Sequence, residues 1–257
     1  MATNDLLLEN VTKRFGGLTA VDRLDMEVCQ GQIYGLIGPN GAGKTTVFNC
    51  ITGIHPCEEG RILWKGEDIT ELPPYRIAAK GIVRTFQTIR LFPQMSVAEN
   101  IMSGRHVKSS QGWWHGIMHT PKSRRDERKN WLKVEEQLEF FQLHEFTVQP
   151  VRSLPYGLQR RVEIARAMAA EPSLLILDEP AAGLNDKETM ALLELVFRIR
   201  EMGVTILLIE HDMDLVMQLT EKLTVINFGK KIAEGTPAQI QQNKDVIEAY
   251  LGSDDDD

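Results

Sequence analysis

The feature that most constrains this chain is its segment Gly38-Pro39-Asn40-Gly41-Ala42-Gly43-Lys44-Thr45. It matches the pattern GxxxxGK[ST], and it lies between an apolar run at 33–37 and the helix-like sequence TTVFNCITG. This context predicts a strand, a glycine-rich loop and a helix that present backbone N–H groups and a positive helix end to phosphate. We expect Lys44 to supply charge to the β- and γ-phosphates, and the Thr45 hydroxyl to be a Mg²⁺ ligand.

A second motif ends the apolar run at 174–177 with two carboxylates, Asp178 and Glu179. The end of a strand that faces a phosphate loop is where a Mg²⁺-holding aspartate belongs. Side chains alternate across a strand, so if Asp178 faces the metal, Glu179 must be displaced by the strand ending, where it could orient or deprotonate a water. Taken alone, the pair also fits a strand end that meets solvent.

The rest of the pattern predicts an α/β fold. Short alternating segments at 6–11, 24–28 and 33–37 are typical of strands, and RILWKGEDIT predicts another strand and turn. The region from about 95 to 170 is predicted to be mostly helical, with apolar residues at three- and four-residue spacing. These residues are Trp131, Val134, Leu138 and Phe141. The apolar runs at 174–177 and 204–210, with a helix at 186–202 between them, predict a unit with parallel strands.

Composition narrows the function classes. The chain has 257 residues and a formal charge of −7, from 29 basic and 36 acidic side chains, which argues against nucleic acid as the main partner. No apolar run approaches the roughly 18 to 20 residues that cross a bilayer, and the first residues do not match a secretory signal, so we expect a cytosolic chain. The three cysteines contain no CxxC pair and are expected to be buried thiols. The acidic tail at 253–257 is expected to be solvated.

Further motifs make the chain resemble the nucleotide-binding subunit of an ABC transporter. The sequence 154–161, LPYGLQRR, resembles the family signature LSGGQ, and Gln87 resembles the glutamine of the Gln-loop. Residues 182–185 resemble the D-loop, His211 the switch histidine, and Phe15 the aromatic that stacks on adenine. The resemblance implies a P-loop NTPase fold of the ABC ATPase type, with a RecA-like core, an antiparallel β subdomain and an inserted helical subdomain. It implies one domain over 1–257, whose helical subdomain at about 95–170 carries an insertion at 104–130.

The resemblance also assigns roles. ATP and Mg²⁺ are the implied ligands. The residues implied in catalysis are Glu179, His211, Gln87 and Lys44. Those implied in nucleotide binding are Phe15, Gly38, Pro39, Asn40, Gly41, Ala42, Gly43, Lys44, Thr45, Thr46, Tyr156, Gly157, Gln159 and Asn185, and those implied in holding the metal are Thr45, Gln87 and Asp178. Alternatives remain for three of them: Phe15 as an ordinary packed aromatic, Gln87 as a hydrogen bonder at a strand end, and His211 as a helix N-terminal residue.

Several details resemble one branch of the family, the LivG-type ATPases of branched-chain amino acid importers. They are the YGxQRR form of the signature, DEPAAGLN, IEHDM, DVIEAYLG and the insertion containing GIMHTPKSRR. This implies two membrane permease subunits, a second ABC ATPase subunit, a periplasmic binding protein and a place at the cytoplasmic face of the inner membrane. The alternatives are a lipopolysaccharide-export ATPase and a non-transport ABC ATPase acting on ribosomes or DNA repair complexes.

Two local features lead to specific expectations. The insertion contains Trp113 and Trp114 before a basic run, and either lies against the membrane subunits or the inner leaflet, or folds on its own subdomain. Pro155 stands where the family signature has a serine. Proline lacks a hydroxyl and an N–H but fits the first turn of a helix, so the helix after it can still point its N-terminal amides at a phosphate.

Overall fold

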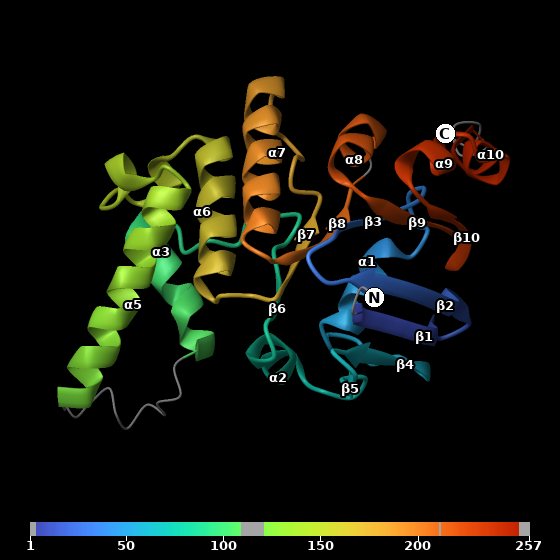
Figure 1. Ribbon diagram of the computed structural model, residues 1–257, viewed down its shortest axis with the longest axis horizontal. Coiled ribbons are helices and arrows are strands. Elements are labelled where there is room, and N and C mark those ends of the chain that lie inside the picture. The colour runs from blue at the N-terminus through green and yellow to red at the C-terminus, as the bar shows by residue number, and fades with distance from the viewer. Residues whose placement is uncertain (1–3, 109–120, 211, 252–257) are drawn as a thin grey trace. The chain divides into compact units, whose positions relative to one another are not determined.

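The structure is a computed structural model that describes residues 4–108, 121–210 and 212–251 (Figure 1). Its strands are β1 (Asn4–Phe15), β2 (Leu18–Cys29), β3 (Ile33–Ile37), β4 (Glu59–Trp64), β5 (Glu67–Asp68), β6 (Ile82–Arg84), β7 (Leu174–Asp178), β8 (Thr205–Ile209), β9 (Lys222–Asn227) and β10 (Lys230–Gly235). Its α-helices are α1 (Lys44–Ile51), α2 (Pro74–Ala79), α3 (Val97–Gly104), α5 (Pro121–Phe140), α6 (Tyr156–Ala169), α7 (Asp186–Glu201), α8 (Met213–Leu219), α9 (Pro237–Gln241) and α10 (Lys244–Leu251). Short 3₁₀ helices are η1 (Arg105–Lys108), η2 (His144–Phe146) and η3 (Val151–Ser153).

The first sheet is antiparallel and has the strand order β2-β1-β4-β5. In β2, the alternate residues Leu24, Met26 and Val28 are at most 2% exposed. This period of two is the pattern of a strand with one face against a core. The alternation expected at 24–28 is therefore confirmed, although the strands β1 and β2 are longer than the segments predicted from the sequence.

The second sheet has the order β10-β9-β3-β8-β7-β6 (Figure 1). Its strands are parallel from β9 to β6, and only β10 pairs antiparallel. Every residue of β3, β7 and β8 is buried, as expected for strands covered on both faces. Because the carboxyl ends of parallel strands meet at one edge, the loop after β3 and the carboxylates at the end of β7 belong to the same edge of this sheet.

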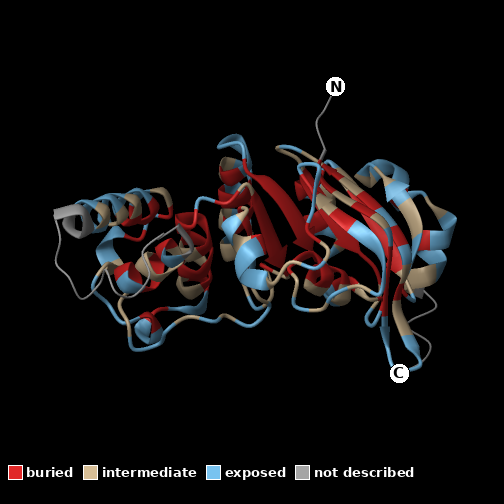
Figure 2. Ribbon diagram, turned by 90° about the horizontal axis from the view of Figure 1, so that it is seen from below, coloured by how far each residue is buried: buried red, intermediate tan, exposed pale blue. Residues whose placement is uncertain are grey.

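Two hydrophobic clusters hold these sheets. The larger one includes Leu6 and Leu24 of the antiparallel sheet, Phe48 of α1, and Ile176 and Leu207 of the parallel sheet. The smaller one lies against β9 and contains Ile37, Val216, Leu223, Val225, Ile240 and Val246. Figure 2 shows the buried strands in red. The helix α1, which follows the phosphate loop, is thus anchored in the larger cluster through its buried side.

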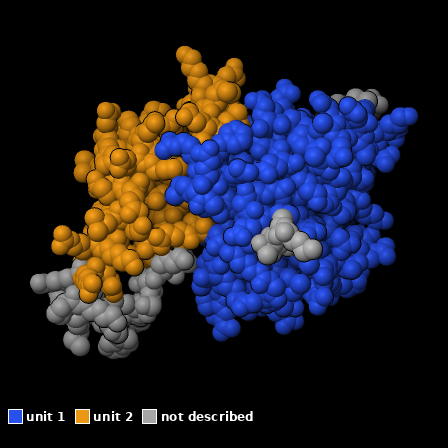
Figure 3. Space-filling view, viewed as in Figure 1, with its two compact units in different colours: residues 1–84, 173–181, 196–257 blue, residues 85–172, 182–195 orange. Residues whose placement is uncertain are grey.

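The chain divides into two compact units, coloured separately in Figure 3. The first unit contains both sheets and consists of residues 1–84, 173–181 and 196–257. The second unit consists of residues 85–172 and 182–195, and in it α3, α5 and α6 pack against one another. Val134, Leu138 and Phe141 of the predicted helical stripe are buried, whereas Trp131 is 44% exposed and does not belong to this core.

Several features differ from the sequence-based expectations. The elements α2, β6, β9, β10 and α8 to α10 were not predicted. Of the three thiols expected to be buried, only Cys50 is; Cys29 and Cys57 are half-buried. In the part of the chain that the structure describes, no helix is both long and apolar enough to cross a membrane. Trp113 and Trp114 of the expected insertion, the acidic tail at 253–257, and His211 lie outside the described residues.

Candidate functional site

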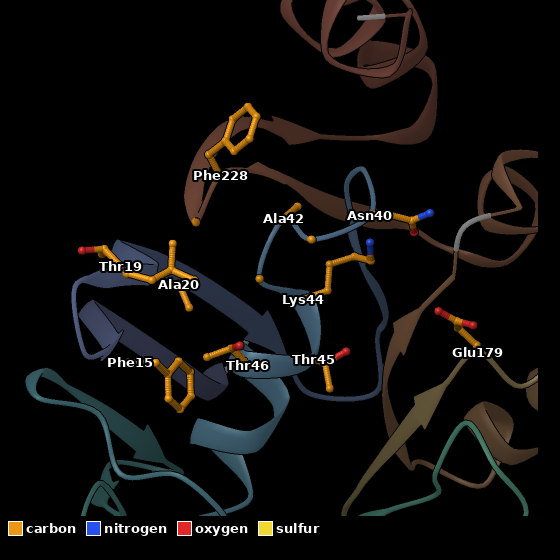
Figure 4. Close-up of a pocket in the computed structure, with 14 residues that line it drawn as sticks. Phe15, Thr19, Ala20, Asn40, Ala42, Lys44, Thr45, Thr46, Glu179 and Phe228 are labelled. Atoms are coloured by element: carbon orange, nitrogen blue, oxygen red, sulfur yellow. The ribbon is translucent and has the colours of Figure 1, made fainter. Parts of the chain in front are cut away.

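A cavity of about 430 Å³ surrounds the phosphate loop in the first unit (Figure 4). It is lined by Phe15, Leu18, Thr19, Ala20, Asn40, Gly41, Ala42, Gly43, Lys44, Thr45, Thr46, Glu179, Phe228 and Gly229. In Figure 4, Lys44 and Thr45 lie between Phe15 on one side and Glu179 on the other. The structure therefore brings together the loop, the aromatic residue and the second carboxylate that the sequence singled out.

The backbone of the loop needs glycine at two positions. Gly38 has φ 152° and Gly43 has φ 103°. A Cβ added to Gly38 would overlap the carbonyl oxygen of Ile226, and one added to Gly43 would overlap the carbonyl oxygen of Ala20. Because β-carbons are excluded by neighbouring backbone, the loop can pack closely between β9 and β2. These two glycines therefore shape the loop.

Lys44 is the first residue of α1 and is 8% exposed. Its Nζ donates to the carbonyl oxygens of Gly38 (2.6 Å) and Pro39 (2.9 Å). Burial lowers the pKa of Lys44, and the negative charges of Glu179 and Asp178 oppose that shift. No side chain caps the N-terminus of α1, where Gly43 is the N-cap. A charged lysine beside an uncapped helix N-terminus is an arrangement that attracts phosphate.

The two carboxylates after β7 have different surroundings. The strand ends at Asp178, and Glu179 has a positive φ of 45°. The Glu179 amide donates to the carbonyl of Ile209 (2.9 Å), and its side chain lines the cavity. Glu179 thus lies just past the end of the strand, while its proposed role toward water stays a prediction.

Asp178 is held by a partner that the sequence did not reveal. Its Oδ2 accepts from Arg84 Nη2 at 2.6 Å, and Arg84 Nη1 also donates to Asn49 Oδ1 at 2.7 Å. The side chains of Arg84 and Asp178 are 5% and 7% exposed, so the ion pair is buried. The parallel pairing of β6 with β7 brings Arg84 to this position. Asp178 is therefore fixed beside the cavity and is not among the residues that line it.

The aromatic side of the cavity contains Phe15, which is 44% exposed. Its ring packs edge-to-face with His55 at 5.4 Å, and Lys13 Nζ lies 5.2 Å from the ring centroid. An exposed face on a nucleotide-sized cavity favours the stacking role over ordinary packing. The role itself stays a prediction.

Sequence reasoning missed the turn between β9 and β10, which also lines the cavity. Phe228 there is 84% exposed and has φ 45°, and Gly229 follows it. The Gly229 amide donates to the carbonyl of Ala42, and its carbonyl accepts from the Asp22 amide, both at 2.9 Å. These bonds attach the turn to the phosphate loop and to β2. The sequence carries a turn signal at Phe228-Gly229 but nothing that places it at the loop.

The remaining predicted residues lie in the second unit. Gln87 is exposed and lies in the connection between β6 and α3, and Tyr156 and Gly157 begin α6. Gln159 Nε2 donates to the carbonyl of Leu154 at 2.8 Å. The Asn185 amide and its Nδ2 donate to Glu188 Oε2 at 3.1 and 2.9 Å, which caps the start of α7.

The start of α6 packs against the start of α7 within this unit. A Cβ on Gly157 would overlap Glu188 Oε1, so the glycine permits close approach. A cavity of about 100 Å³ lies beside these residues, and it is lined by Gly157, Leu158, Arg160, Arg161, Leu184, Glu188 and Leu192. Pro155 is the N-cap of α6, with φ −53° and ψ 152°. It therefore lies one residue before the first turn of the helix, whereas the sequence predicted it within that turn.

The donor set of the first unit fits a hydrated Mg²⁺ bound with phosphate. Thr45 supplies a hydroxyl and Glu179 a carboxylate on the cavity, and Asp178 is adjacent in the chain. Mg²⁺ prefers oxygen ligands, keeps several waters, and needs only one or two protein ligands when phosphates complete its shell. Among the described residues no cluster of three or more His, Cys, Asp or Glu side chains could hold a metal by itself.

Comparison with known proteins adds independent information. Residues 21–182 match the family model described as ABC transporter, and residues 230–256 match that described as branched-chain amino acid ATP-binding cassette transporter. The chain is 49% identical to the high-affinity branched-chain amino acid transport ATP-binding protein BraF of Pseudomonas aeruginosa, over 96% of this chain and 97% of BraF. It is 47% identical to LivG of Escherichia coli, with the same coverage. The lipopolysaccharide export ATP-binding protein LptB of Escherichia coli is 34% identical over 99% of each chain.

A solved structure agrees with these relatives. The crystal structure of an ATP-binding cassette of an ABC transporter in its ADP conformation superposes with a TM-score of 0.85. That protein is 32% identical, with 97% of this chain and 99% of the other covered. The predicted fold class, a P-loop ABC ATPase fold, is thereby confirmed. With its phosphate loop, its two sheets and this likeness over nearly its whole length, the chain belongs to the ABC transporter family of ATP-binding proteins.

Proposed function

We propose that this protein is the ATP-binding and hydrolysing subunit of an ABC importer for branched-chain amino acids. The observation that carries the chemistry is the cavity in which Lys44, the uncapped start of α1 and Glu179 meet. The cargo is supported by the relatives, which are branched-chain amino acid transport proteins at 46–49% identity, and by the family match at residues 230–256.

The residues of the cavity suggest how hydrolysis proceeds. Amides of the loop and of the start of α1 bind the phosphates, and Lys44 exchanges its bonds to the Gly38 and Pro39 carbonyls for bonds to phosphate oxygens. Phe15 packs against the adenine ring. Glu179 takes a proton from the attacking water. At the same time the water oxygen bonds to the γ-phosphorus, and the bond between that phosphorus and ADP breaks.

Mg²⁺ would be held by Thr45, Asp178 and Gln87, and it would neutralise charge that develops on the phosphate oxygens. The buried ion pair with Arg84 holds the Asp178 carboxylate in place. His211 would contact the γ-phosphate. Tyr156, Gly157, Gln159 and Asn185 would contribute to the ATP site of a second cassette in a head-to-tail pair.

The partners follow from this role. Two transmembrane permease subunits would form the path for the amino acid, a second ABC ATPase subunit would complete the pair, and a periplasmic binding protein would deliver the cargo. The protein would then lie at the cytoplasmic face of the inner membrane. The lipopolysaccharide-export alternative has weaker support, because the identity to LptB is 34% against 49% to BraF.

Uptake by cells tests the proposal. Cells whose only copy of this subunit carries Lys44→Met should lose ATP-dependent import of labelled leucine, while Lys129→Met, at an exposed lysine of the second unit, should leave import unchanged. Proline import by the same cells checks that general transport is intact. Intact leucine import with defective lipopolysaccharide transport in the Lys44→Met cells would contradict the proposed cargo and favour the alternative.

A further inference from the structure

Helix α6 contains a fully buried guanidinium that faces a loop far away in sequence. Arg160 is 1% exposed. Its Nη1 donates to the carbonyl of Phe86 (3.0 Å) and to Glu163 Oε2 (2.7 Å), and its Nη2 donates to the carbonyl of Gln87 (2.9 Å). A buried charge persists only where it is paired and hydrogen-bonded. Residues 85–90 are called the Gln loop below, and two successive carbonyls of this loop accept hydrogen bonds from the Arg160 guanidinium.

The same loop is attached to α6 at its other end. Arg166 Nη1 donates to the carbonyl of Arg90 at 2.5 Å, and the Arg90 amide donates to Glu163 Oε1 at 3.4 Å. The Arg90 guanidinium also lies 4.4 Å from the centroid of the Phe86 ring. Burial raises the pKa of Glu163, and the positive charge of Arg160 opposes that shift. Both ends of the Gln loop are thus fixed to one face of the helix.

Tyr156 extends this network to the start of α6. Its hydroxyl accepts from Arg160 Nη2 at 3.2 Å, and its ring centroid lies 5.9 Å from the guanidinium carbon. The ring also lies close to Gly183, where an added Cβ would be 3.2 Å from a ring carbon. The Gln loop and the start of α6 therefore meet at this guanidinium, and Tyr156 links them to Gly183.

We propose that Arg160 is a positioning residue that joins the Gln loop to the start of α6, so that the two move as one body. A shift of Gln87 is then transmitted to Tyr156 and Gly157. Lysine cannot replace it, because a single ammonium lacks the planar fork that reaches two successive carbonyls together with Glu163 and Tyr156. The proposal rests on the proposed function, which gives Gln87 and the start of α6 their roles toward ATP.

Hydrogen exchange of the full chain without nucleotide tests the attachment directly. In Arg160→Lys, the amides of residues 86–90 should exchange about tenfold faster or more, since hydrogen bonds of a charged donor are lost, while the amides of α1 remain as protected as before. The matched control is Arg105→Lys. Arg105 is a second buried arginine of the same unit, and its guanidinium donates to Asn130 Oδ1 and to the carbonyl of Ala169 instead of to the Gln loop in the part of the chain that the structure describes. Unchanged exchange at 86–90 in a folded Arg160→Lys protein would overturn the proposal.

A second variant covers the case in which Arg160→Lys does not fold. Glu163→Gln keeps an acceptor oxygen but removes the charge that holds the guanidinium, so the same amides should exchange faster, by a smaller factor. Unchanged exchange at 86–90 in this variant would also overturn the attachment.

Enzymatic measurements separate positioning from folding. Arg160→Lys should lower kcat by about 10- to 100-fold with little change in ATP affinity, because the bonds of Arg160 go to Phe86, Gln87, Glu163 and Tyr156 of its own unit. Arg105→Lys should change neither quantity. An equal loss of kcat in the two variants would refute the specific role of Arg160. If the wild-type chain itself failed to bind ATP, the proposed function would fail, whereas the exchange result at 86–90 would still decide whether Arg160 holds the loop.

Discussion

The replacement Pro155→Ser should affect two properties of the start of α6 differently: the stability of the helix and its hydrogen bonding to phosphate. Pro155 is the N-cap of this helix, its carbonyl accepts from the Gln159 amide at 3.0 Å, and it offers no side-chain acceptor to the first helical amides. A serine hydroxyl can accept from the amide of residue 158 and at the same time donate its own proton outward. In the proposed pair of cassettes, that proton would go to the γ-phosphate held by the other subunit.

The magnitudes of these effects differ. A serine N-cap stabilises a helix by about 1 kcal/mol, and loss of the proline ring costs about 0.4–1 kcal/mol through the unfolded chain. The free energy of unfolding should therefore change by less than about 1 kcal/mol, which shifts Tm by only a few degrees for a chain of this size. A hydrogen bond to phosphate contributes about 1.5–3 kcal/mol, so closure of the pair should strengthen about tenfold or more.

The assay measures the apparent KM for ATP of the assembled transporter, and the lifetime of the ATP-bound pair in a Glu179→Gln background. Pro155→Ala is the matched control, since it removes the ring without adding a hydroxyl. We expect a lower KM and a longer lifetime for serine than for alanine, with similar Tm values. If serine and alanine behave alike, the helix amides suffice and the reasoning about the hydroxyl is refuted.

Three further predictions concern the first unit. Glu179→Gln should retain ATP binding and lower turnover by about 10²- to 10⁴-fold, because the amide cannot accept a proton; near-normal hydrolysis would remove Glu179 from that role. Phe15→Ala should raise the apparent KM for ATP by about 5- to 100-fold, because stacking on adenine is lost. Phe92→Ala, at an exposed phenylalanine of the second unit, should leave this KM unchanged. A fall in Tm with unchanged KM in Phe15→Ala would show that Phe15 only packs. Burial raises the pKa of Cys50 to about 12, so at pH 8 it should carry about a thousandfold less thiolate than an ordinary cysteine and resist iodoacetamide until the chain unfolds. The alkylation is followed by mass spectrometry, and a rate for Cys50 in the native protein equal to that in the unfolded chain would contradict its burial on α1.

Local sequence was enough to predict the phosphate loop and its two flanking elements. The physical reason is that the information is contained in a short stretch: glycines at Gly38 and Gly43 permit positive φ, and the helix that starts at Lys44 follows directly. The ending of β7 at Asp178 was predictable in the same way, because an apolar run followed by two acids cannot continue as a buried strand. The helical start at Tyr156 followed from the proline before it.

Tertiary structure decided which distant residues complete these motifs. Arg84 reaches Asp178 only because β6 pairs with β7, and the Phe228-Gly229 turn reaches the phosphate loop only because β9 lies beside β3. Arg160 donates to carbonyls 74 and 73 residues earlier in the chain. In the sequence, this arginine looks like one more basic residue of LPYGLQRR, on a helix with Glu163 one turn later. Such contacts depend on strand order, register and helix packing, which no local pattern encodes, and so only the folded chain shows them.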